Sequence, residues 1–328
     1  MEIALVTPYK NYNGGVEVIT KQIVQILQSN GHRITWFTMD NHRKTLVEKF
    51  ITFFLTDAYV TAKQFKKSNT KFDLVICNGE FGYGIKHSKS ISVFHGSYLG
   101  YSKSLNSNIG FKSKLHFKLL EKIQLLASKG KYVVTVSDFN KTILEEQGIA
   151  VDEIISNSVD TDKFKPLNLI KNEKYLFVGS YDYYGKGFDL LEKLTDKGIQ
   201  IDCITDIEPS SKLGWLKNID NNKMPEIFNK YLGLIFPSRF ESFGMVVAEA
   251  LSCGLPVFTS NVGLGFELKN EIPEYVSLEN SASQYLLRME KVKKSYPEFC
   301  QKSREFATAH FSYNNFRTQW LDLINKFE

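Results

Sequence analysis

Two glutamates, Glu241 and Glu249, flank a short glycine turn in the otherwise apolar stretch LIFPSRFESFGMVVAEALSCGLPVFTS, residues 234–260. A carboxylate in such surroundings is costly unless a hydrogen-bond donor pairs with it. Glu241 lies in a loop after an apolar run of strand length, and Glu249 lies within an apolar helix that ends at Gly254. The pattern predicts a strand, loop, helix, strand unit of a parallel sheet. Ligands of such sheets gather at the carboxyl ends of the strands, so both carboxylates are candidate ligand contacts.

Two glycine turns elsewhere could approach a phosphate. Gly14 and Gly15 separate the first predicted strand from a helix, where bare backbone N–H groups can meet an anion. The spacing is not GxGxxG, and a plain tight turn is the alternative. In the second turn, GSYDYYGKGF, Lys186 stands just before Gly187 and the next predicted helix. Lys186 could neutralise a phosphate or simply be solvated, but it falls at the same end of the same predicted sheet as Glu241.

Composition indicates a globular protein of two domains. The chain has 328 residues, which exceeds the usual size of one domain. A formal net charge of +5 is too mild to indicate a nucleic-acid partner. The N-terminus has no basic leader, and no apolar run reaches the ~20 residues that span a bilayer. We therefore expect a cytoplasmic protein.

The four cysteines are far apart in the sequence and form no cluster with the spacing of metal ligands. They are Cys77, Cys203, Cys253 and Cys300. We expect reduced thiols.

Strands and helices alternate along the chain. Strands are predicted at EIALVTP, RITWFTM, FDLVICN, SISVFHG and YVVTVS, with room for crossover helices between them. After the polar connector LNLIKNE the alternation restarts. The pattern predicts an α/β fold with two doubly wound, Rossmann-like domains, residues 1–166 and 172–311, and a ligand cleft between them. We expect a C-terminal helix, about residues 312–328, to pack back on the first domain.

The stretch that contains Glu241 and Glu249 resembles a known family signature. The run PSRFESFGMVVAEALSCGLPV is similar to the E-x7-E motif of retaining nucleotide-sugar glycosyltransferases with the GT-B fold, family 4 in particular. Further matches occur in the family's order: NGGVE, FHG, VSDFNKTIL, ISNSVDTDKFKP, FVGS and KGFDLL. The resemblance runs from about residue 3 to the C-terminal helix. It implies a GT-B architecture, with an acceptor-side N-terminal domain and a donor-binding C-terminal domain facing a central cleft.

The resemblance also implies roles for the donor-side residues. Glu249 matches the glutamate that accepts hydrogen bonds from the donor ribose, and Glu241 matches the one beside the donor sugar. Lys186 matches the lysine that stabilises the leaving phosphate. The backbone amides of Ser242, Phe243 and Gly244 would face the pyrophosphate at a helix N-terminus. These groups together could replace a divalent cation, and because no DxD-type carboxylate pair is suitably placed, we expect neither a catalytic metal nor a cofactor.

Three further positions complete the predicted site. His95, in SISVFHGSY, matches a histidine that positions the donor sugar, although a lone histidine at a strand end can be purely structural. Ser180 departs from the family, where many members have an arginine as one of two cations on the pyrophosphate. Arg239 is our hypothesis for the missing cation, with surface solvation as the alternative. No nucleophile is nominated, since the leaving phosphate oxygen can itself take the acceptor's proton.

A basic segment stands apart from the donor motifs. The segment from Lys103 through Lys131 contains seven lysines and one acid, Glu121. The lysines at helical spacing on one side are Lys114, Lys118 and Lys122, and the apolar residues that can line another are Leu115, Leu119, Ile123 and Leu126. This helix could present a solvated face over a core face, or it could rest on anionic lipid.

The sequence therefore predicts a retaining, metal-independent glycosyltransferase. It would move a hexose from a nucleotide diphosphate sugar, UDP-linked on family frequency, to a glycan or lipid-linked acceptor in surface polysaccharide or glycolipid assembly. We expect a cytoplasmic enzyme, with peripheral contact to the inner face of the membrane as an option and no nucleic-acid partner. The alternatives are a catalytically silent sugar-nucleotide-binding subunit, which Ser180 keeps open, and a GT-B nucleotide-sugar epimerase.

Overall fold

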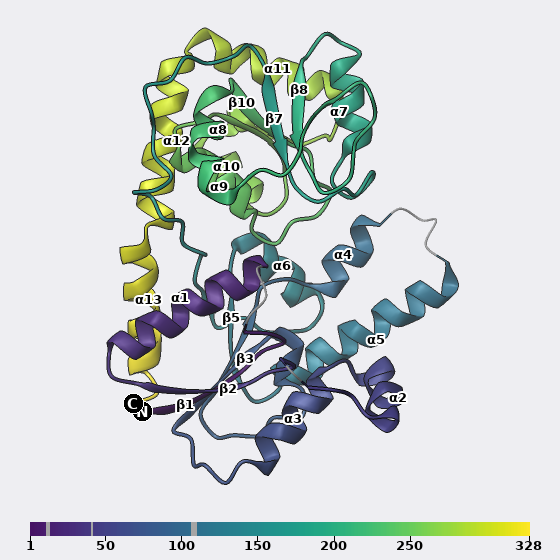
Figure 1. Ribbon diagram of the computed structural model, residues 1–328, viewed down its shortest axis with the longest axis vertical. Coiled ribbons are helices and arrows are strands. Elements are labelled where there is room, and N and C mark those ends of the chain that lie inside the picture. Colours follow the sequence, from purple (N-terminus) through teal and green to yellow (C-terminus); the bar gives the residue numbers. More distant parts are fainter. Residues whose placement is uncertain (11–13, 41, 106–109) are drawn as a thin grey trace. The chain divides into compact units, whose positions relative to one another are not determined.

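The computed structural model describes residues 1–10, 14–40, 42–105 and 110–328 (Figure 1). The chain forms two compact units. Unit 1 holds the chain through Ser156, apart from a short segment at 104–106, together with Phe316–Glu328. Unit 2 holds Asn157–Asn315 and that short segment. Each unit has its own parallel sheet with helices, which confirms the predicted α/β class.

The change from unit 1 to unit 2 lies at Ser156, earlier than residue 166, where the sequence led us to expect it. The segment that follows is held by unit 2. The Val159 amide donates to the Phe311 carbonyl at 2.9 Å, and the Arg304 guanidinium donates to the carbonyls of Thr161 and Phe164 at 3.0 and 2.9 Å. These bonds form between distant parts of the chain, so the polar connector at residues 167–173 gave no sign of them.

Unit 1 contains a six-stranded sheet in the order β2-β1-β3-β4-β5-β6, with all pairs parallel. Its strands are β1 (Glu2–Val6), β2 (Arg33–Phe37), β3 (Leu74–Asn78), β4 (Ser90–Phe94), β5 (Tyr132–Thr135) and β6 (Glu153–Ile154). The five longer strands are those that the sequence predicted. The sixth has only two residues and is too short to produce a periodic pattern.

Helices connect the strands of unit 1. They are α1 (Gly15–Ser29), α2 (Leu46–Leu55), α3 (Ala58–Lys67), the 3-10 helix η1 (Gly79–Gly82), α4 (Tyr98–Ser104), α5 (Phe111–Ser128) and α6 (Asp138–Glu146). One core cluster lies between the sheet and this layer and includes Ala4, Val6, Val75 and Cys77. Their complete burial is what a parallel sheet covered by helices requires.

Unit 2 contains a second parallel sheet, in the order β12-β11-β10-β7-β8-β9. Its strands are β7 (Tyr175–Val178), β8 (Ile201–Ile204), β9 (Gly214–Leu216), β10 (Gly233–Phe236), β11 (Val257–Ser260) and β12 (Val276–Ser277). Its helices are α7 (Phe188–Thr195), η2 (Asn221–Lys223), α8 (Met224–Lys230), α9 (Met245–Ser252), α10 (Leu264–Glu271), η3 (Pro273–Tyr275), α11 (Ala282–Lys294) and α12 (Tyr296–Phe311).

The strand order of unit 2 creates a switch point between β7 and β10. From β7 the chain builds β8 and β9 toward one edge, and it then returns to place β10 on the other side of β7. The loops that leave β7 and β10 therefore diverge from neighbouring strands. In open α/β sheets, ligands bind in the crevice outside the carboxyl ends of the strands at such a point.

The last helix, α13 (Tyr313–Asn325), returns the chain to unit 1 (Figure 1). Its buried face is formed by Phe316, Trp320, Leu323 and Ile324. The Lys326 ammonium after it donates to Glu153 of β6 at 2.8 Å. Among the described residues, none of the helices has both the length and the apolar composition needed to span a bilayer.

Candidate functional site

Lys186 and Glu241 meet at the switch point of unit 2. Lys186 follows β7 and Glu241 follows β10, and the Lys186 Nζ atom donates to Glu241 Oε2 at 2.7 Å. The two side chains are 23% and 25% exposed, so both can reach a ligand. The ammonium also lies 5.5 Å from the centre of the Phe236 ring. The sequence placed these two residues at the same end of the sheet, and the structure brings them into direct contact.

Close contact between two backbones positions this pair. Gly187 has φ of 77°, and a Cβ atom there would come within 2.5 Å of the Pro237 carbonyl oxygen. Next to it, the Arg239 amide donates to the Gly185 carbonyl at 2.8 Å. Glycine is therefore required at position 187 both for its conformation and for the close approach. The turn that carries Lys186 is fixed against the loop that carries Glu241.

The loop after β10 ends in a helix N-terminus that is open to an anion. Gly244 has φ of 100° and precedes α9. The amides of Phe243, Gly244 and Met245 donate no hydrogen bond to any residue that the structure describes. Unpaired N–H groups and the helix dipole together favour a negative group at this position. The predicted anion contacts of Phe243 and Gly244 thus have a suitable geometry, and Ser242, which is buried beside them, begins the same turn.

The backbone at Gly263 packs closely against this turn. Its φ is 51°, and a Cβ atom would come within 2.6 Å of the Phe243 carbonyl oxygen and 3.1 Å of the Glu241 carbonyl oxygen. The Leu264 amide donates to that same Phe243 carbonyl at 2.8 Å. The hydrogen bond from Leu264 to the Phe243 carbonyl therefore fixes the backbone whose amides are open to a ligand.

Glu249 is a half-buried residue of α9, whose buried residues are otherwise mostly apolar. Burial raises the pKa of its carboxyl group to about 7, with Lys163 acting weakly in the opposite direction. None of the described residues donates a hydrogen bond to this carboxylate. A carboxylate held in this state gains from any ligand that donates hydroxyl groups to it. Among the described residues, Glu249 therefore lacks the hydrogen-bond donor that a carboxylate on an apolar helix requires.

Arg239 is already engaged by the protein. Its guanidinium forms a bidentate pair with Asp189, at 2.8 and 2.9 Å, and lies 3.7 Å from the centre of the Tyr184 ring. It also donates to the Tyr184 carbonyl. Burial opposes its charged form, but the Asp189 carboxylate outweighs this effect and raises the pKa of Arg239. In this conformation Arg239 binds α7 to the loop after β10 and is not the free second cation of our hypothesis.

Ser180 lies at the exposed end of β7, where many family members have an arginine. The amide of the next residue, Tyr181, donates to Asp206 at 2.7 Å, and this bond helps to fix the backbone directly after β7. Within the described part of the chain, no group of three or more His, Cys, Asp or Glu side chains is arranged to hold a metal ion.

His95 belongs to unit 1, directly after β4. Its Nε2 atom is buried and has no hydrogen-bond partner among the described residues. Burial lowers its pKa to about 4, so the imidazole is neutral at neutral pH. A buried ring nitrogen without a partner is unusual and leaves a place for one more hydrogen bond.

Gly14 and Gly15 start α1 in unit 1, after β1. Gly14 is extended and Gly15 is the first helical residue. A Cβ atom at Gly15 would meet nothing within 4 Å, so close packing does not by itself require glycine there. Residues 11–13 of the NYNGG turn lie outside the described residues.

Comparison with protein families agrees with this geometry. A family model described as Glycosyl transferases group 1 matches residues 200–309, and one described as Glycosyltransferase Family 4 matches residues 13–163. The first range carries Glu241 and Glu249, and the second carries His95. Both models describe glycosyltransferases, and the second is the model of family 4. The family recognised from the motifs is confirmed.

Solved structures show the same fold over the whole glycosyltransferase chain. Sucrose-phosphate synthase from Thermosynechococcus elongatus is 17% identical with a TM-score of 0.77, covering 99% of this chain and 98% of that one. The lipopolysaccharide outer core galactosyltransferase WaaB is 16% identical with a TM-score of 0.68, covering 99% of both chains. HepE from Anabaena in complex with UDP-glucose is 12% identical with a TM-score of 0.73, covering 99% and 100%. These likenesses establish the GT-B fold.

Curated sequence relatives extend over less of the glycosyltransferase. A relative from Klebsiella pneumoniae is 28% identical over 62% of this chain. The chain spans 62% of that relative's length and smaller shares of the other curated relatives that it matches.

Sequence reasoning missed the residues that support the site of this glycosyltransferase. Asp189 holds Arg239, and Asp182 accepts the Gly185 amide at 2.9 Å, which shapes the turn before Lys186. The signal for Asp182 was present, because Asp three residues before Gly is typical of a hydrogen-bonded turn. Asp189 gave only the signal of an acid in the first turn of a helix, which does not identify its partner.

Proposed function

We propose that this protein is a retaining glycosyltransferase that moves a hexose from a nucleoside diphosphate sugar to a glycan or lipid-linked acceptor. The observation that carries the proposal is the cluster at the switch point of unit 2. There the Lys186–Glu241 pair, three open amides at the start of α9 and the unsatisfied Glu249 carboxylate come from two adjacent loops and one helix. This set has a cation and N–H donors for a diphosphate and an acceptor for hydroxyl groups.

Each group has a part that follows from its chemistry. The diphosphate would accept hydrogen bonds from the amides of Phe243, Gly244 and Met245 and from the Lys186 ammonium. Its arrival would replace Glu241 as the partner of Lys186 and free the Glu241 carboxylate to orient hydroxyls of the donor sugar. As the bond between sugar and phosphate breaks, Lys186 would stabilise the growing charge on the leaving oxygen, and Glu241 the positive charge at the anomeric carbon.

Glu249 would accept the ribose hydroxyls of the nucleotide. Ribose binding would give its carboxylate the hydrogen bonds that the described residues do not supply. We keep Gly14, Gly15 and Ser180 as proposed donor contacts. On unit 1, His95 remains our choice for a group that positions the sugar, because its buried Nε2 atom has no partner among the described residues.

We propose further that the reaction needs no metal and that the donor carries UDP. The Lys186 ammonium and the helix N-terminus provide positive charge at the place where a metal would otherwise act. HepE, which shares the fold, has been solved with UDP-glucose, and this supports a uridine nucleotide. WaaB acts in lipopolysaccharide assembly, which supports an acceptor in surface polysaccharide or glycolipid synthesis at the inner face of a membrane.

A thermal-shift panel tests the donor site directly. UDP, GDP, ADP and CMP are compared with EDTA present, on the wild type and on Glu249→Ala. We expect stabilisation by one nucleoside diphosphate, lost in the variant. No shift from any nucleotide would overturn the proposal. A shift without turnover of any sugar nucleotide would instead favour the silent sugar-nucleotide-binding subunit, the alternative that the missing arginine at position 180 keeps open.

A further inference from the structure

Helix α2 in unit 1 exposes its apolar side chains and buries a carboxylate. Leu46 is 84% exposed, Phe50 is 70% exposed and Phe54 is 46% exposed, and their spacing of four residues places them on one stripe. Val47 beside them is also exposed. Glu48, in contrast, is buried. Amphipathic helices of globular proteins show the opposite arrangement.

A polar anchor fixes this orientation of α2. The Glu48 amide donates to the Thr45 hydroxyl, and the Glu48 carboxylate accepts from the Thr45 amide at 3.0 Å, which together form a capping box. The carboxylate also accepts from Lys63 at 3.0 Å and contacts His42 at 3.1 Å. These bonds, first the one from Thr45, lower the pKa of Glu48 to about 2. The exposed stripe is therefore built into the fold.

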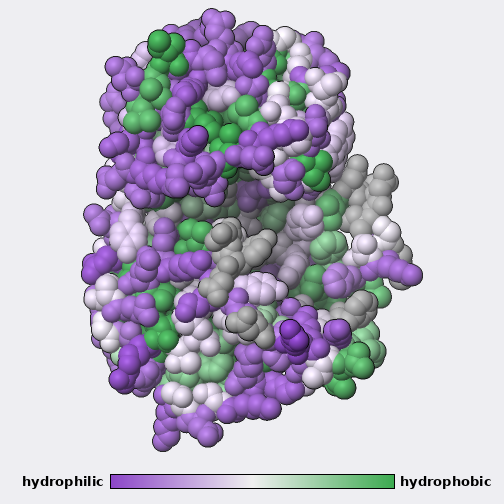
Figure 2. Space-filling model, viewed as in Figure 1, coloured by the Kyte–Doolittle hydropathy of each residue, from purple (hydrophilic) through white to green (hydrophobic). Residues whose placement is uncertain are grey.

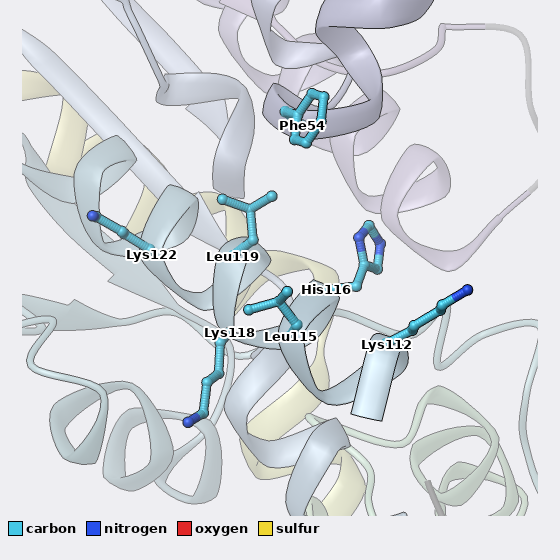
Figure 3. Close-up of a pocket in the computed structure, with 7 residues that line it drawn as sticks. All are labelled: Phe54, Lys112, Leu115, His116, Lys118, Leu119 and Lys122. Carbon is cyan, nitrogen blue, oxygen red and sulfur yellow. The ribbon is translucent and has the colours of Figure 1, made fainter. Parts of the chain in front are cut away.

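The exposed stripe adjoins a cavity of about 570 Å³ between α2 and α5. Phe54 lines it from α2, and Leu115, His116 and Leu119 line it from α5. In Figure 3 the Leu119 and His116 side chains point toward Phe54, while three lysines extend outward around them. Figure 2 shows hydrophobic surface where α2 lies in Figure 1. An apolar hollow and an apolar ridge thus lie together on one surface.

The exposure of α5 differs from what its sequence predicted. Leu115 is 61% exposed and Leu126 is 37% exposed, which differs from the first of our two alternatives for this helix, in which both would line a core. The residues that α5 buries are Leu120, Ile123, Gln124, Ala127 and Ser128. Among the described side chains, the first residue that α5 buries is therefore Leu120, and Leu115 in the preceding turn contributes to the exposed surface.

Within the described part of the chain, the lysines on and beside the cavity wall lack acidic partners. Lys112, Lys114, Lys118 and Lys122 are exposed, and none forms an ion pair with another described residue. On α8 and α12, by comparison, Lys230 and Lys302 each pair with a glutamate one turn away. Glu121, the one acid of α5, accepts instead from the Ser102 hydroxyl at 3.0 Å. The charge that the described side chains place around the apolar surface is therefore positive.

We propose that this surface of α2 and α5 docks on an anionic lipid bilayer. Leu46, Phe50 and Phe54 would enter the boundary between headgroups and acyl chains, and the hollow beside them would take part of one acyl chain. The four lysines would meet the headgroup phosphates. Apolar and cationic groups on one exposed surface match a negatively charged lipid boundary, where each cation adds to binding and apolar contact adds the rest.

An anionic bilayer accounts for both the exposed apolar side chains and the lysines of this surface, and other partners do so less well. Nucleic acid would use the lysines but leave exposed phenylalanines unexplained. A second copy of this chain would bring its own lysines to the same place, where like charges repel. The inference deepens the proposed function and rests on it for its meaning, because a surface of this kind would hold unit 1 at the membrane where a lipid-linked acceptor lies.

Vesicle flotation without nucleotide tests the docking surface independently of the donor site. The protein is mixed with vesicles of phosphatidylcholine alone or of an equimolar mixture with phosphatidylglycerol. We expect binding to the mixed vesicles only, weakened by salt. The triple variant Lys112→Gln, Lys118→Gln, Lys122→Gln should bind less tightly, on the order of fivefold for each lysine removed. The double variant Leu46→Ser, Phe50→Ser should lose binding at high salt, where the lysines contribute little.

Two matched variants of unit 2 serve as controls. Lys291→Gln, Lys293→Gln, Lys294→Gln removes three exposed lysines from α11, and Ile170→Ser, Leu278→Ser removes two strongly exposed apolar side chains. Both should bind vesicles as the wild type does. Equal loss in the controls, or no binding by the wild type, would overturn the inference.

Two further measurements separate the remaining explanations. Light scattering that shows dimers of the wild type and monomers of Leu46→Ser, Phe50→Ser, with no vesicle binding, would assign the surface to a second copy and overturn the inference. All variants should keep the nucleotide-induced thermal shift. A protein that binds vesicles but no nucleotide would refute the proposed function and leave the docking surface standing.

Discussion

At the scale of single residues, loss of Lys186 should weaken nucleotide binding and leave the stability of the fold almost unchanged. Lys186→Ala removes one charge-assisted contact to a diphosphate, so we expect the nucleotide Kd to rise about tenfold to a hundredfold. Glu241, left without its partner, is 25% exposed and can be hydrated, so the melting temperature should hardly change. Titration calorimetry measures the first effect and thermal unfolding the second. Lys197→Ala, which removes an exposed lysine after α7, is the control and should change neither.

Arg239 should show the reverse behaviour. Arg239→Ala leaves Asp189, which is 19% exposed, without its bidentate partner, and we expect the free energy of unfolding to fall by about 1–3 kcal/mol. Nucleotide Kd should stay within about threefold of the wild type, because the guanidinium is bound to the protein. Denaturant titration and calorimetry on the same preparation give both values. A rise in Kd as large as that of Lys186→Ala would restore Arg239 as a cation on the pyrophosphate.

The raised pKa of Glu249 makes stability depend on pH. Its carboxyl group has a pKa of about 7 in the folded chain, against an ordinary value of 4.5. The folded state holds a proton that the unfolded state loses first, so the group's contribution to stability falls as pH rises from about 4.5 to 7. Glu249→Gln removes this effect. We expect the variant to match the wild type near pH 4.5 and to be more stable at about pH 8, by roughly 2–3 kcal/mol.

Nucleotide binding should reverse that preference. Ribose hydroxyls donate to the ionised carboxylate, so the complex favours loss of the proton. We expect the wild type to bind UDP more tightly as pH rises through 7 and to release a proton near pH 6.5, measurable by calorimetry in buffers of different ionisation enthalpy. Glu249→Gln should release none. Equal proton release by both proteins would remove Glu249 from the ribose site.

At the scale of elements, close contact between two glycine-containing loops aligns the proposed donor contacts. Gly263→Ala would force an alanine into φ of 51° and place its Cβ atom 2.6 Å from the Phe243 carbonyl oxygen. We expect a loss of more than about 2 kcal/mol of stability and a weaker nucleotide affinity, because the turn with the open amides must move. Gly198→Ala is the matched control, since its φ is 91° but nothing lies within 4 Å. It should cost about 1 kcal/mol and leave affinity unchanged.

These elements differ in how far the sequence could predict them. The unit β10, α9, β11 follows from a buried apolar run, a glycine turn and a helical period, all of which are local signals. The approach of Lys186 to Glu241 followed from topology, because the carboxyl ends of neighbouring parallel strands share one edge. The ion pair between Asp189 and Arg239 could not be predicted from the sequence. Any of several acids could pair with this arginine, and only the tertiary structure determines which one does.

Helix α2 shows why hydrophobic pattern alone misleads. Its stripe of Leu46, Phe50 and Phe54 has the period of a buried face, and so does the stripe of Leu115 and Leu119 on α5. Period shows that apolar residues share a face and does not show what covers that face. The capping box and the Lys63 contact of Glu48 decide which side of α2 turns inward. A polar anchor of this kind joins distant segments and gives no periodic signal.

At the scale of the whole molecule, the path of the chain assigns its last helix to the first unit. The buried face of α13 contributes Phe316 and Trp320 to unit 1, with their rings 6.2 Å apart. Unit 1 is thus completed only after unit 2 has been traversed. Lys186, Glu241 and Glu249, the proposed donor contacts with the most direct geometry, all belong to unit 2. We therefore expect damage to the core of unit 1 to leave most of the nucleotide affinity intact.

Trp320→Ala tests this separation. Trp320 is 1% exposed, and truncation of a buried tryptophan to alanine costs about 3–5 kcal/mol. We expect hydrogen exchange to accelerate across β1 and β3 of unit 1 while peptides from α9 keep their protection, and the nucleotide-induced protection of α9 should persist. Trp215→Ala is the reciprocal variant, because Trp215 lies on β9 of unit 2 and donates to the Thr205 carbonyl at 3.1 Å. It should loosen peptides of unit 2 and spare β1. If both variants accelerated exchange equally in both units, the two would unfold as one cooperative body, and nucleotide affinity would then depend on the C-terminal helix as well.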